Sequence, residues 1–139
     1  MRRLFVFDWD GTLMDSVGRI VSCLRQAADE QGLADLGDAA FGDVIGLGLP
    51  QAIAQLYPQL DQRQIEQFRA TYAARFVAAD GRPSQLFPGA LELLEAVRDR
   101  GHWIAVATGN SRRGLDRVLG ELGLSDSFHA TRCADETAS

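Results

Sequence analysis

Two aspartates near the N-terminus, Asp8 and Asp10, carry the strongest chemical signal in this sequence. They follow the apolar run Leu4–Phe7, whose composition predicts a short strand buried on both faces. Gly11 permits the sharp backbone turn expected of a site at the carboxyl end of a parallel strand. In such a pair, one carboxylate can act as a nucleophile and the other can donate and accept protons. Paired carboxylates also attract Mg²⁺, although the same residues could simply cap a turn.

A second polar segment follows a second apolar run. The run Trp103–Ala107 predicts another buried strand, and Thr108, Gly109 and Asn110 come directly after it. A hydroxyl and exposed backbone N–H groups at the start of a helix can bind an anion. Taken alone, the segment is more simply explained as a strand-to-helix turn capped by Ser111. Because the carboxyl ends of parallel strands meet at one edge of a sheet, the two segments together predict one shared site.

Hydropathy patterning divides the chain into an α/β part and a helical part. The helical part covers residues 17–82, with predicted helices at 17–32, 51–56 and 61–79, a turn-rich stretch at 33–42 and a loop at 44–50. The α/β part covers residues 1–16 and 83–139, with further predicted helices at 90–100 and 112–122 and a strand within 128–133. This order predicts a parallel, Rossmann-like sheet with right-handed crossovers and an inserted α-helical cap.

Composition excludes several classes of function. The net charge of −5 argues against sequence-independent binding of nucleic acid, which requires a basic face. No apolar run approaches the ~18 residues that a membrane span needs. Cys23 and Cys133 are too far apart in sequence to suggest a disulfide framework or a zinc site. The apolar start is too short for a signal peptide, so we expect a cytoplasmic protein.

The two polar segments resemble known motifs. Residues 8–16 (DWDGTLMDS) are similar to the D-x-D-G-T-L-x-D-S first motif of the haloacid dehalogenase-like (HAD) hydrolases. Residues 106–110 (VATGN) resemble the second motif of that family, a strand that ends in Thr or Ser. The helical insertion resembles the cap of the phosphoglycolate phosphatase and β-phosphoglucomutase branch, as do residues 45–50 and 134–137. The resemblance extends over essentially the whole chain.

The resemblance implies a role for each candidate residue. Asp8 would be the nucleophile that forms an aspartyl-phosphate, and Asp10 would be the general acid and base. The Asp8 carboxylate and the Asp10 backbone carbonyl would hold Mg²⁺. Thr108 would bind the phosphoryl oxygens, with Gly109 and Asn110 beside it. The dehalogenase members carry Tyr at the position of Asp10, so the resemblance favours phosphoryl chemistry over cleavage of carbon–halogen bonds.

The implied activity is that of a Mg²⁺-dependent phosphatase acting on a small phosphorylated metabolite, with phosphoglycolate as the leading candidate. A phosphomutase of the β-phosphoglucomutase type would share both acids. A non-catalytic domain that binds phosphate or a partner is the third possibility. It gains support because the third motif of the family is a lysine and no lysine follows Thr108 in this sequence.

The C-terminal residues also depart from the family pattern. Asp135 and Glu136 match the stretch before the missing lysine, not the acidic pair of the fourth motif, which completes the Mg²⁺ site. We therefore expect the N-terminal part of a longer enzyme, with an incomplete sheet and little or no activity of its own. In the family, the first strand lies beside a strand that comes later than Ser139. The strand Leu4–Phe7 is accordingly expected to keep an unpaired edge that invites self-association.

Overall fold

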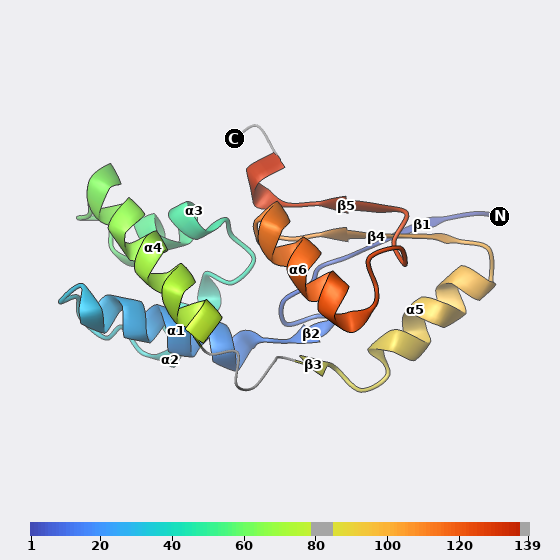
Figure 1. The fold of residues 1–139 in the computed structure, drawn as a ribbon, viewed down its shortest axis with the longest axis horizontal. Helices are drawn as coiled ribbons and strands as arrows, with labels where there is room; N and C mark the ends of the chain where they lie inside the picture. The colour runs from blue at the N-terminus through green and yellow to red at the C-terminus, as the bar shows by residue number, and fades with distance from the viewer. Residues whose placement is uncertain (79–84, 137–139) are drawn as a thin grey trace. The chain divides into compact units, whose positions relative to one another are not determined.

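The computed structural model describes residues 1–78 and 85–136, which form two compact units (Figure 1). Unit 1 comprises residues 1–15 and 86–139, and unit 2 comprises residues 16–85. The elements in chain order are β1 (Leu4–Phe7), β2 (Met14–Asp15), α1 (Val17–Glu30), α2 (Asp38–Asp43), α3 (Leu49–Leu56), α4 (Gln62–Ala78), β3 (Gln85–Leu86), α5 (Ala90–Asp99), β4 (Trp103–Ala107), α6 (Arg112–Leu122), β5 (Ala130–Arg132) and the 3₁₀ helix η2 (Ala134–Glu136). Each unit has its own hydrophobic core.

Unit 1 is built on a parallel sheet with the strand order β1-β4-β5. Leu4 is in register with Trp103 on β4, and Ala105 on β4 is in register with Ala130 on β5. Helix α6 connects β4 to β5, as a parallel crossover requires. The predicted parallel α/β architecture is therefore confirmed.

Helices α5 and α6 cover the same face of this sheet (Figure 1). Ile104 and Val106 of β4 are buried in one cluster with Leu94 of α5 and with Leu115 and Leu119 of α6. The pleat sends alternate side chains to the opposite face, on which the helices of this cluster do not pack. The apolar sides of α5 and α6 therefore form a single layer on one face of the sheet.

Strand β1 is more exposed than its apolar sequence predicts. Leu4 and Val6 are 56% and 58% exposed, and Phe7 alone among the four residues is half-buried. The prediction of a strand buried on both faces is wrong for two reasons. β1 lies at an edge of the described sheet, and Leu4 and Val6 belong to the face opposite the two helices.

The short elements β2, β3, α2 and η2 were not anticipated from the sequence. The two-residue strands β2 and β3 pair with each other, and each is too short to show an alternating hydropathy pattern. Helix α2 begins within the stretch 33–42 that was predicted as turns, and it ends one residue beyond that stretch, at Asp43. It begins after Gly37, whose φ of 89° favours glycine.

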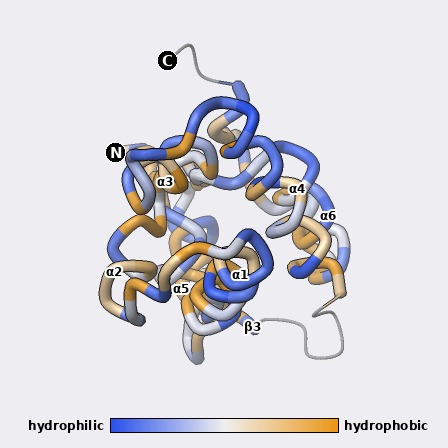
Figure 2. Tube along the Cα trace, turned by 90° about the vertical axis from the view of Figure 1, so that its left-hand side faces the viewer, coloured by the Kyte–Doolittle hydropathy of each residue, from blue (hydrophilic) through white to orange (hydrophobic). Residues whose placement is uncertain are grey.

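Unit 2 is helical, as predicted for this part of the chain. Its core contains Phe41, Ile53 and Phe68, which are fully buried, and Tyr57, whose ring lies 6.0 Å from that of Phe68. The trace of α1 contains both hydrophobic and hydrophilic residues, as an amphipathic helix requires (Figure 2). The predicted helix end at residue 79 and the predicted boundary between the two parts of the chain, at residues 82 and 83, lie outside the described residues.

Helix α4 begins with a reciprocal capping box. The Asp61 carboxylate accepts a hydrogen bond from the Gln64 N–H at 2.8 Å, and the Gln64 side-chain oxygen accepts one from the Asp61 N–H at 2.9 Å. Two backbone donors at the helix start are thus satisfied by side chains.

We predict that Asp61→Ala lowers the free energy of unfolding by about 1 kcal/mol, because the Gln64 N–H loses its acceptor. Urea denaturation followed by circular dichroism measures this change. Gln62→Ala, an exposed substitution one residue away, is the matched control and should change stability much less. Equal effects of the two substitutions would show that the capping box contributes nothing.

Candidate active site

The loop after β1 is anchored by Trp9. Its indole is only 1% exposed and meets the ring of Phe128 edge-on, with 6.4 Å between the ring centroids. Asp8 is exposed, and its carboxylate accepts a hydrogen bond from the Trp9 N–H at 2.8 Å. The buried tryptophan therefore fixes the backbone at the strand end while the Asp8 carboxylate stays accessible to solvent.

A tight turn follows Asp10. Gly11 has a φ of 78°, which side-chain-bearing residues rarely adopt, and its N–H donates to the Met14 carbonyl at 2.9 Å. The Trp9 carbonyl accepts from the N–H groups of Leu13 and Met14 at 3.0 and 2.9 Å. These bonds fold the chain back directly after the second aspartate, so the glycine predicted to permit a turn does so.

Asn110 joins the two polar segments that the sequence singled out. Its side-chain Nδ2 donates to Oδ2 of Asp10 at 2.9 Å, although the residues are 100 positions apart. Its backbone N–H donates to the Thr108 hydroxyl at 3.2 Å. The structure thus brings Asp10, Thr108 and Asn110 together at the carboxyl ends of β1 and β4, with Gly109 between the latter two.

The N-terminus of α6 is capped by two side chains. The Ser111 hydroxyl accepts from the Gly114 N–H at 3.1 Å. The Asp135 carboxylate accepts from the Arg112 N–H, with distances of 3.0 and 3.2 Å to its two oxygens. A carboxylate at this end of a helix also interacts favourably with the helix dipole.

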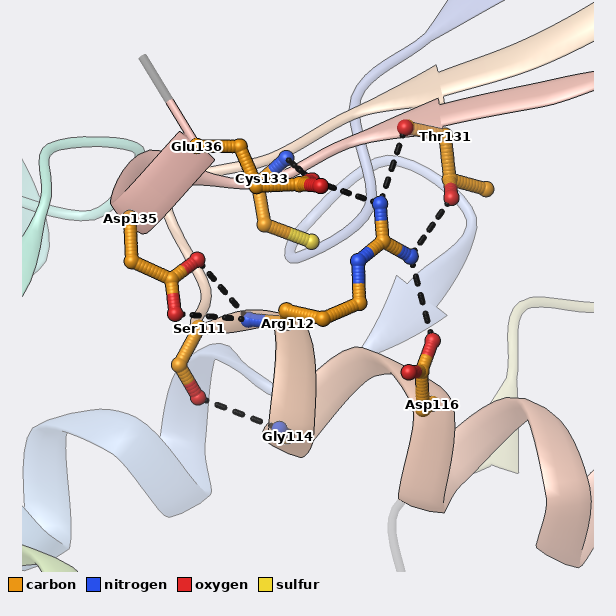
Figure 3. A network of polar contacts seen from close by, with 8 residues as sticks. All are labelled: Ser111, Arg112, Gly114, Asp116, Thr131, Cys133, Asp135 and Glu136. Atoms are coloured by element: carbon orange, nitrogen blue, oxygen red, sulfur yellow. Dashed lines mark hydrogen bonds and ion pairs between the residues drawn. The ribbon is translucent and has the colours of Figure 1, made fainter. Parts of the chain in front are cut away.

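The side chain of Arg112 organises the residues around this helix start (Figure 3). Its guanidinium donates to the hydroxyl and carbonyl of Thr131 at 2.6 and 2.9 Å, to Asp116 at 3.0 Å and to Glu136 at 2.5 Å. Sequence analysis missed this role, although the i,i+4 spacing of Arg112 and Asp116 indicates an ion pair. Arg112 therefore ties α6 to β5 and to η2.

Hydrogen bonding and burial shift the pKa values of Glu136 and Cys133 in this region. The hydrogen bond from Arg112 is the largest cause of the lowered pKa of Glu136, followed by the bond from the Cys133 N–H. Burial raises the pKa of the Cys133 thiol to about 11, so the thiol is protonated at neutral pH. Asp135 accepts from the backbone N–H of Arg112, and Glu136 accepts from its guanidinium.

The donor groups at the strand ends suit Mg²⁺ in kind. Asp8 offers carboxylate oxygens and Asp10 a backbone carbonyl oxygen, and Mg²⁺ commonly binds one or two carboxylates while keeping several waters. Within residues 1–78 and 85–136, no cluster of three or more His, Cys, Asp or Glu side chains could hold a metal ion.

All fourteen lysine and arginine residues of the sequence are arginines. Arg112, which follows the second polar segment, is already engaged by two carboxylates.

No described helix has the length and apolar content needed to cross a bilayer.

A family model described as haloacid dehalogenase-like hydrolase matches residues 5–139. This chain belongs to the haloacid dehalogenase-like hydrolases. A phosphoglycolate phosphatase of Agrobacterium fabrum is 29% identical, with 97% of this chain and 60% of the relative covered. Tyrosine-protein kinase PtkA of Mycobacterium tuberculosis is 32% identical, with 91% of this chain and 42% of the relative covered.

The fold of this HAD-like chain is also seen in solved structures. The crystal structure of a hydrolase from Pseudomonas syringae superimposes with a TM-score of 0.86 at 22% identity, covering 99% of this chain and 64% of that one. At this level of identity the likeness shows the fold alone. The chain spans about 60% of the length of the phosphoglycolate phosphatase that it matches.

The Arg112–Glu136 pair should make stability depend on pH. Because the pKa of folded Glu136 lies below its ordinary value of 4.5, its carboxylate form stabilises the fold above pH 4.5. This contribution is lost as the pH falls through the lowered pKa of the folded state. We predict that Glu136→Gln is less stable than the parent at pH 7 and that the two converge under strongly acidic conditions.

Urea titrations of both proteins across this pH range measure the difference. Glu121→Gln, which alters an exposed i,i+4 pair with Arg117 on the same helix α6, is the matched control. A stability difference between Glu136→Gln and the parent that is independent of pH would contradict the assignment.

Proposed function

We propose that this HAD-like chain carries the nucleophile and the general acid of a Mg²⁺-dependent phosphatase that acts on a small phosphorylated metabolite. The observation that supports this proposal most directly is the hydrogen bond from Asn110 to Asp10. It joins the acidic loop after β1 to the polar loop after β4, as a site shared by both loops requires.

In the first step, a carboxylate oxygen of Asp8 attacks phosphorus and the bond between phosphorus and the ester oxygen breaks. Asp10 gives its proton to the departing oxygen, so the leaving group departs as a neutral alcohol. The product on the protein is an aspartyl-phosphate at Asp8. Asn110 holds Oδ2 of Asp10 as an acceptor, so we assign the transferred proton to Oδ1.

In the second step, Asp10 removes a proton from water, which attacks the phosphorus of the aspartyl-phosphate. The bond from phosphorus to the Asp8 oxygen breaks, inorganic phosphate leaves, and both aspartates return to their starting states. The same two residues thus act in both halves of the cycle, with Asp10 alternating between acid and base.

The remaining candidate residues bind or orient. The Thr108 hydroxyl and the Gly109 N–H contact the phosphoryl oxygens in this proposal, since both lie in the loop that follows β4, beside the Asp10 carboxylate held by Asn110. Asn110, first predicted to bind substrate, is assigned a positioning role because its side chain is committed to Asp10. When bound by the Asp8 carboxylate and the Asp10 carbonyl, Mg²⁺ neutralises phosphoryl charge.

Phosphoglycolate is the proposed substrate. This proposal rests on the name of the Agrobacterium fabrum relative, which is 29% identical to this chain over 139 aligned residues. The reaction product distinguishes a phosphatase from a mutase. A phosphatase releases inorganic phosphate, whereas a mutase forms an isomeric sugar phosphate. Cytoplasmic location and the absence of nucleic-acid partners remain parts of this proposal.

A second candidate is a phosphate-binding domain without turnover. The observation that favours it is the engagement of Arg112 by the carboxylates of Asp116 and Glu136. Loss of one charge-stabilising donor commonly lowers the rate of a related reaction by ~10²–10³. We therefore expect weak turnover by the chain, detectable only with high enzyme concentration and long incubation.

We predict that Asp8→Asn abolishes Mg²⁺-dependent release of p-nitrophenol from p-nitrophenyl phosphate, because the amide cannot form the aspartyl-phosphate. Asp126→Asn, which removes one exposed carboxylate from the same unit, is the matched control and should keep the parent rate. Equal turnover by the parent and Asp8→Asn would contradict the mechanism. Phosphate binding by a parent chain that shows no turnover would support the second candidate instead.

We also predict that Asn110→Ala lowers kcat by roughly 10²-fold with a smaller change in KM. A misoriented Asp10 would stabilise the transition state less, while substrate binding would change little. Ser111→Ala is the control, since it removes the cap of α6 without a described contact to Asp10. A rise in KM at constant kcat would indicate that Asn110 binds substrate, as the sequence first suggested.

A further inference from the structure

The short helix η2 contacts the residue that orients the proposed acid. The Ala134 N–H donates to the backbone carbonyl of Asn110 at 3.0 Å, and the Asn110 side chain in turn donates to Asp10. None of the three residues of η2 is buried. A single 3₁₀ turn has poor hydrogen-bond geometry, so it depends on contacts with other elements to keep its place. The groups that hold η2 therefore bear on the orientation of Asn110.

Arg112 holds the chain on both sides of Ala134 (Figure 3). Before Ala134, its guanidinium donates to the hydroxyl and carbonyl of Thr131 at 2.6 and 2.9 Å. After Ala134, it donates to the carboxylate of Glu136 at 2.5 Å. The backbone N–H of Arg112 also donates to the carboxylate of Asp135. One arginine thus fixes the segment from which the Ala134 N–H reaches the candidate site.

Both backbone polar groups of Asn110 are engaged. Its N–H donates to the Thr108 hydroxyl at 3.2 Å, and its carbonyl accepts from Ala134. With the backbone fixed, two side-chain torsions decide where the amide points, and the amide donates to Oδ2 of Asp10 at 2.9 Å. A shift of the Ala134 N–H would rotate the Asn110 peptide group and move the side-chain amide away from the carboxylate.

We propose that Arg112 is a positioning residue for the general acid, and that it acts on Asp10 through η2 and Asn110. The inference rests on the proposed function of Asp10. Because the charge of Arg112 is paired with Asp116 and Glu136, the arginine acts by holding geometry and not by attracting phosphate. Its planar guanidinium suits this task, since it donates to several acceptors in fixed directions.

Two substrates separate a misplaced acid from a general disturbance of the site. The oxygen that leaves phenyl phosphate is more basic than the one that leaves p-nitrophenyl phosphate, so its departure depends more on the proton from Asp10. Arg112→Gln should lower kcat/KM for phenyl phosphate roughly tenfold, because small misplacements of a catalytic group are costly. The loss with p-nitrophenyl phosphate should be much smaller. Equal losses with the two substrates would overturn the proposal.

A double-mutant cycle tests whether Arg112 acts through Asn110. In the Asn110→Ala background, Arg112→Gln should lower kcat/KM for phenyl phosphate by less than about twofold, because the connection to Asp10 is already broken. Losses that multiply would overturn the proposal, since Arg112 would then act independently of Asn110.

Two further variants separate geometry from charge. Arg112→Lys keeps the positive charge but lacks the planar guanidinium, so it should lose as much activity as Arg112→Gln. Parent activity in Arg112→Lys would overturn the proposal, because charge alone would then suffice. Asp116→Asn is the matched control, since it removes the contact of Arg112 that stays within α6. It should keep kcat/KM within about twofold of the parent, because exposed ion pairs contribute little.

Hydrogen exchange tests the first part of this connection without any turnover. In Arg112→Gln, the Ala134 amide should exchange at least roughly tenfold faster than in the parent, whereas Asp116→Asn should leave its exchange unchanged. Glu136→Gln, which removes one contact and keeps the arginine, should give a smaller change in the same direction. Circular dichroism checks that each variant is folded. Unchanged exchange in folded Arg112→Gln would overturn the proposal.

NMR tests the second part. The signal of the Asn110 side-chain amide, assigned by its loss in Asn110→Ala, should move in Arg112→Gln toward its position in Asp10→Ala. An unmoved signal would overturn the inference, whatever the activity of the parent. If exchange and signal change as expected but the parent shows no turnover, the connection from Arg112 to Asp10 stands and the proposed hydrolysis is contradicted instead.

Discussion

The hydrogen bond between Asn110 and Asp10 is the contact on which the candidate site depends. It connects two loops that are 100 residues apart in sequence and that leave neighbouring parallel strands at the same edge. On one side, Trp9 and the turn at Gly11 fix the acidic loop. On the other side, Asn110 is itself held by Thr108 and by the Ala134 N–H, which donates to its carbonyl at 3.0 Å. Asp10, the proposed acid, is thus held by the loops that follow both strands.

The same arrangement accounts for the place of the C-terminal residues. Arg112 uses its side chain to hold Thr131 and Glu136, while its backbone N–H is held by Asp135. These contacts stabilise the start of α6, where the proposed phosphoryl-binding groups lie. A cation committed to two carboxylates is poorly suited to neutralise a phosphoryl group as well. The proposed site therefore combines an acid held by Asn110 with an Arg112 whose charge is already paired.

Residue types and spacing predicted much of this molecule. The apolar runs and their polar ends located β1 and β4, and the shared sheet edge predicted that Asp10 and Thr108 would be close. The strands β2 and β3 have two residues each, so no periodic signal could reveal them. The network of Arg112 joins residues distant in sequence and depends on tertiary packing. The exposure of Leu4 and Val6 depends on which face the helices cover, which hydropathy does not specify.

The central claim is that Asp8 receives the phosphoryl group, and mass spectrometry of the Asp10→Asn variant tests it most directly. Without a residue that can activate water, the aspartyl-phosphate should accumulate when this variant is incubated with Mg²⁺ and p-nitrophenyl phosphate. The account predicts the added mass of one phosphoryl group on the peptide that contains Asp8, and none when Mg²⁺ is omitted. Phosphorylation of a different residue, or an unmodified Asp8 in a variant whose parent turns over, would contradict it.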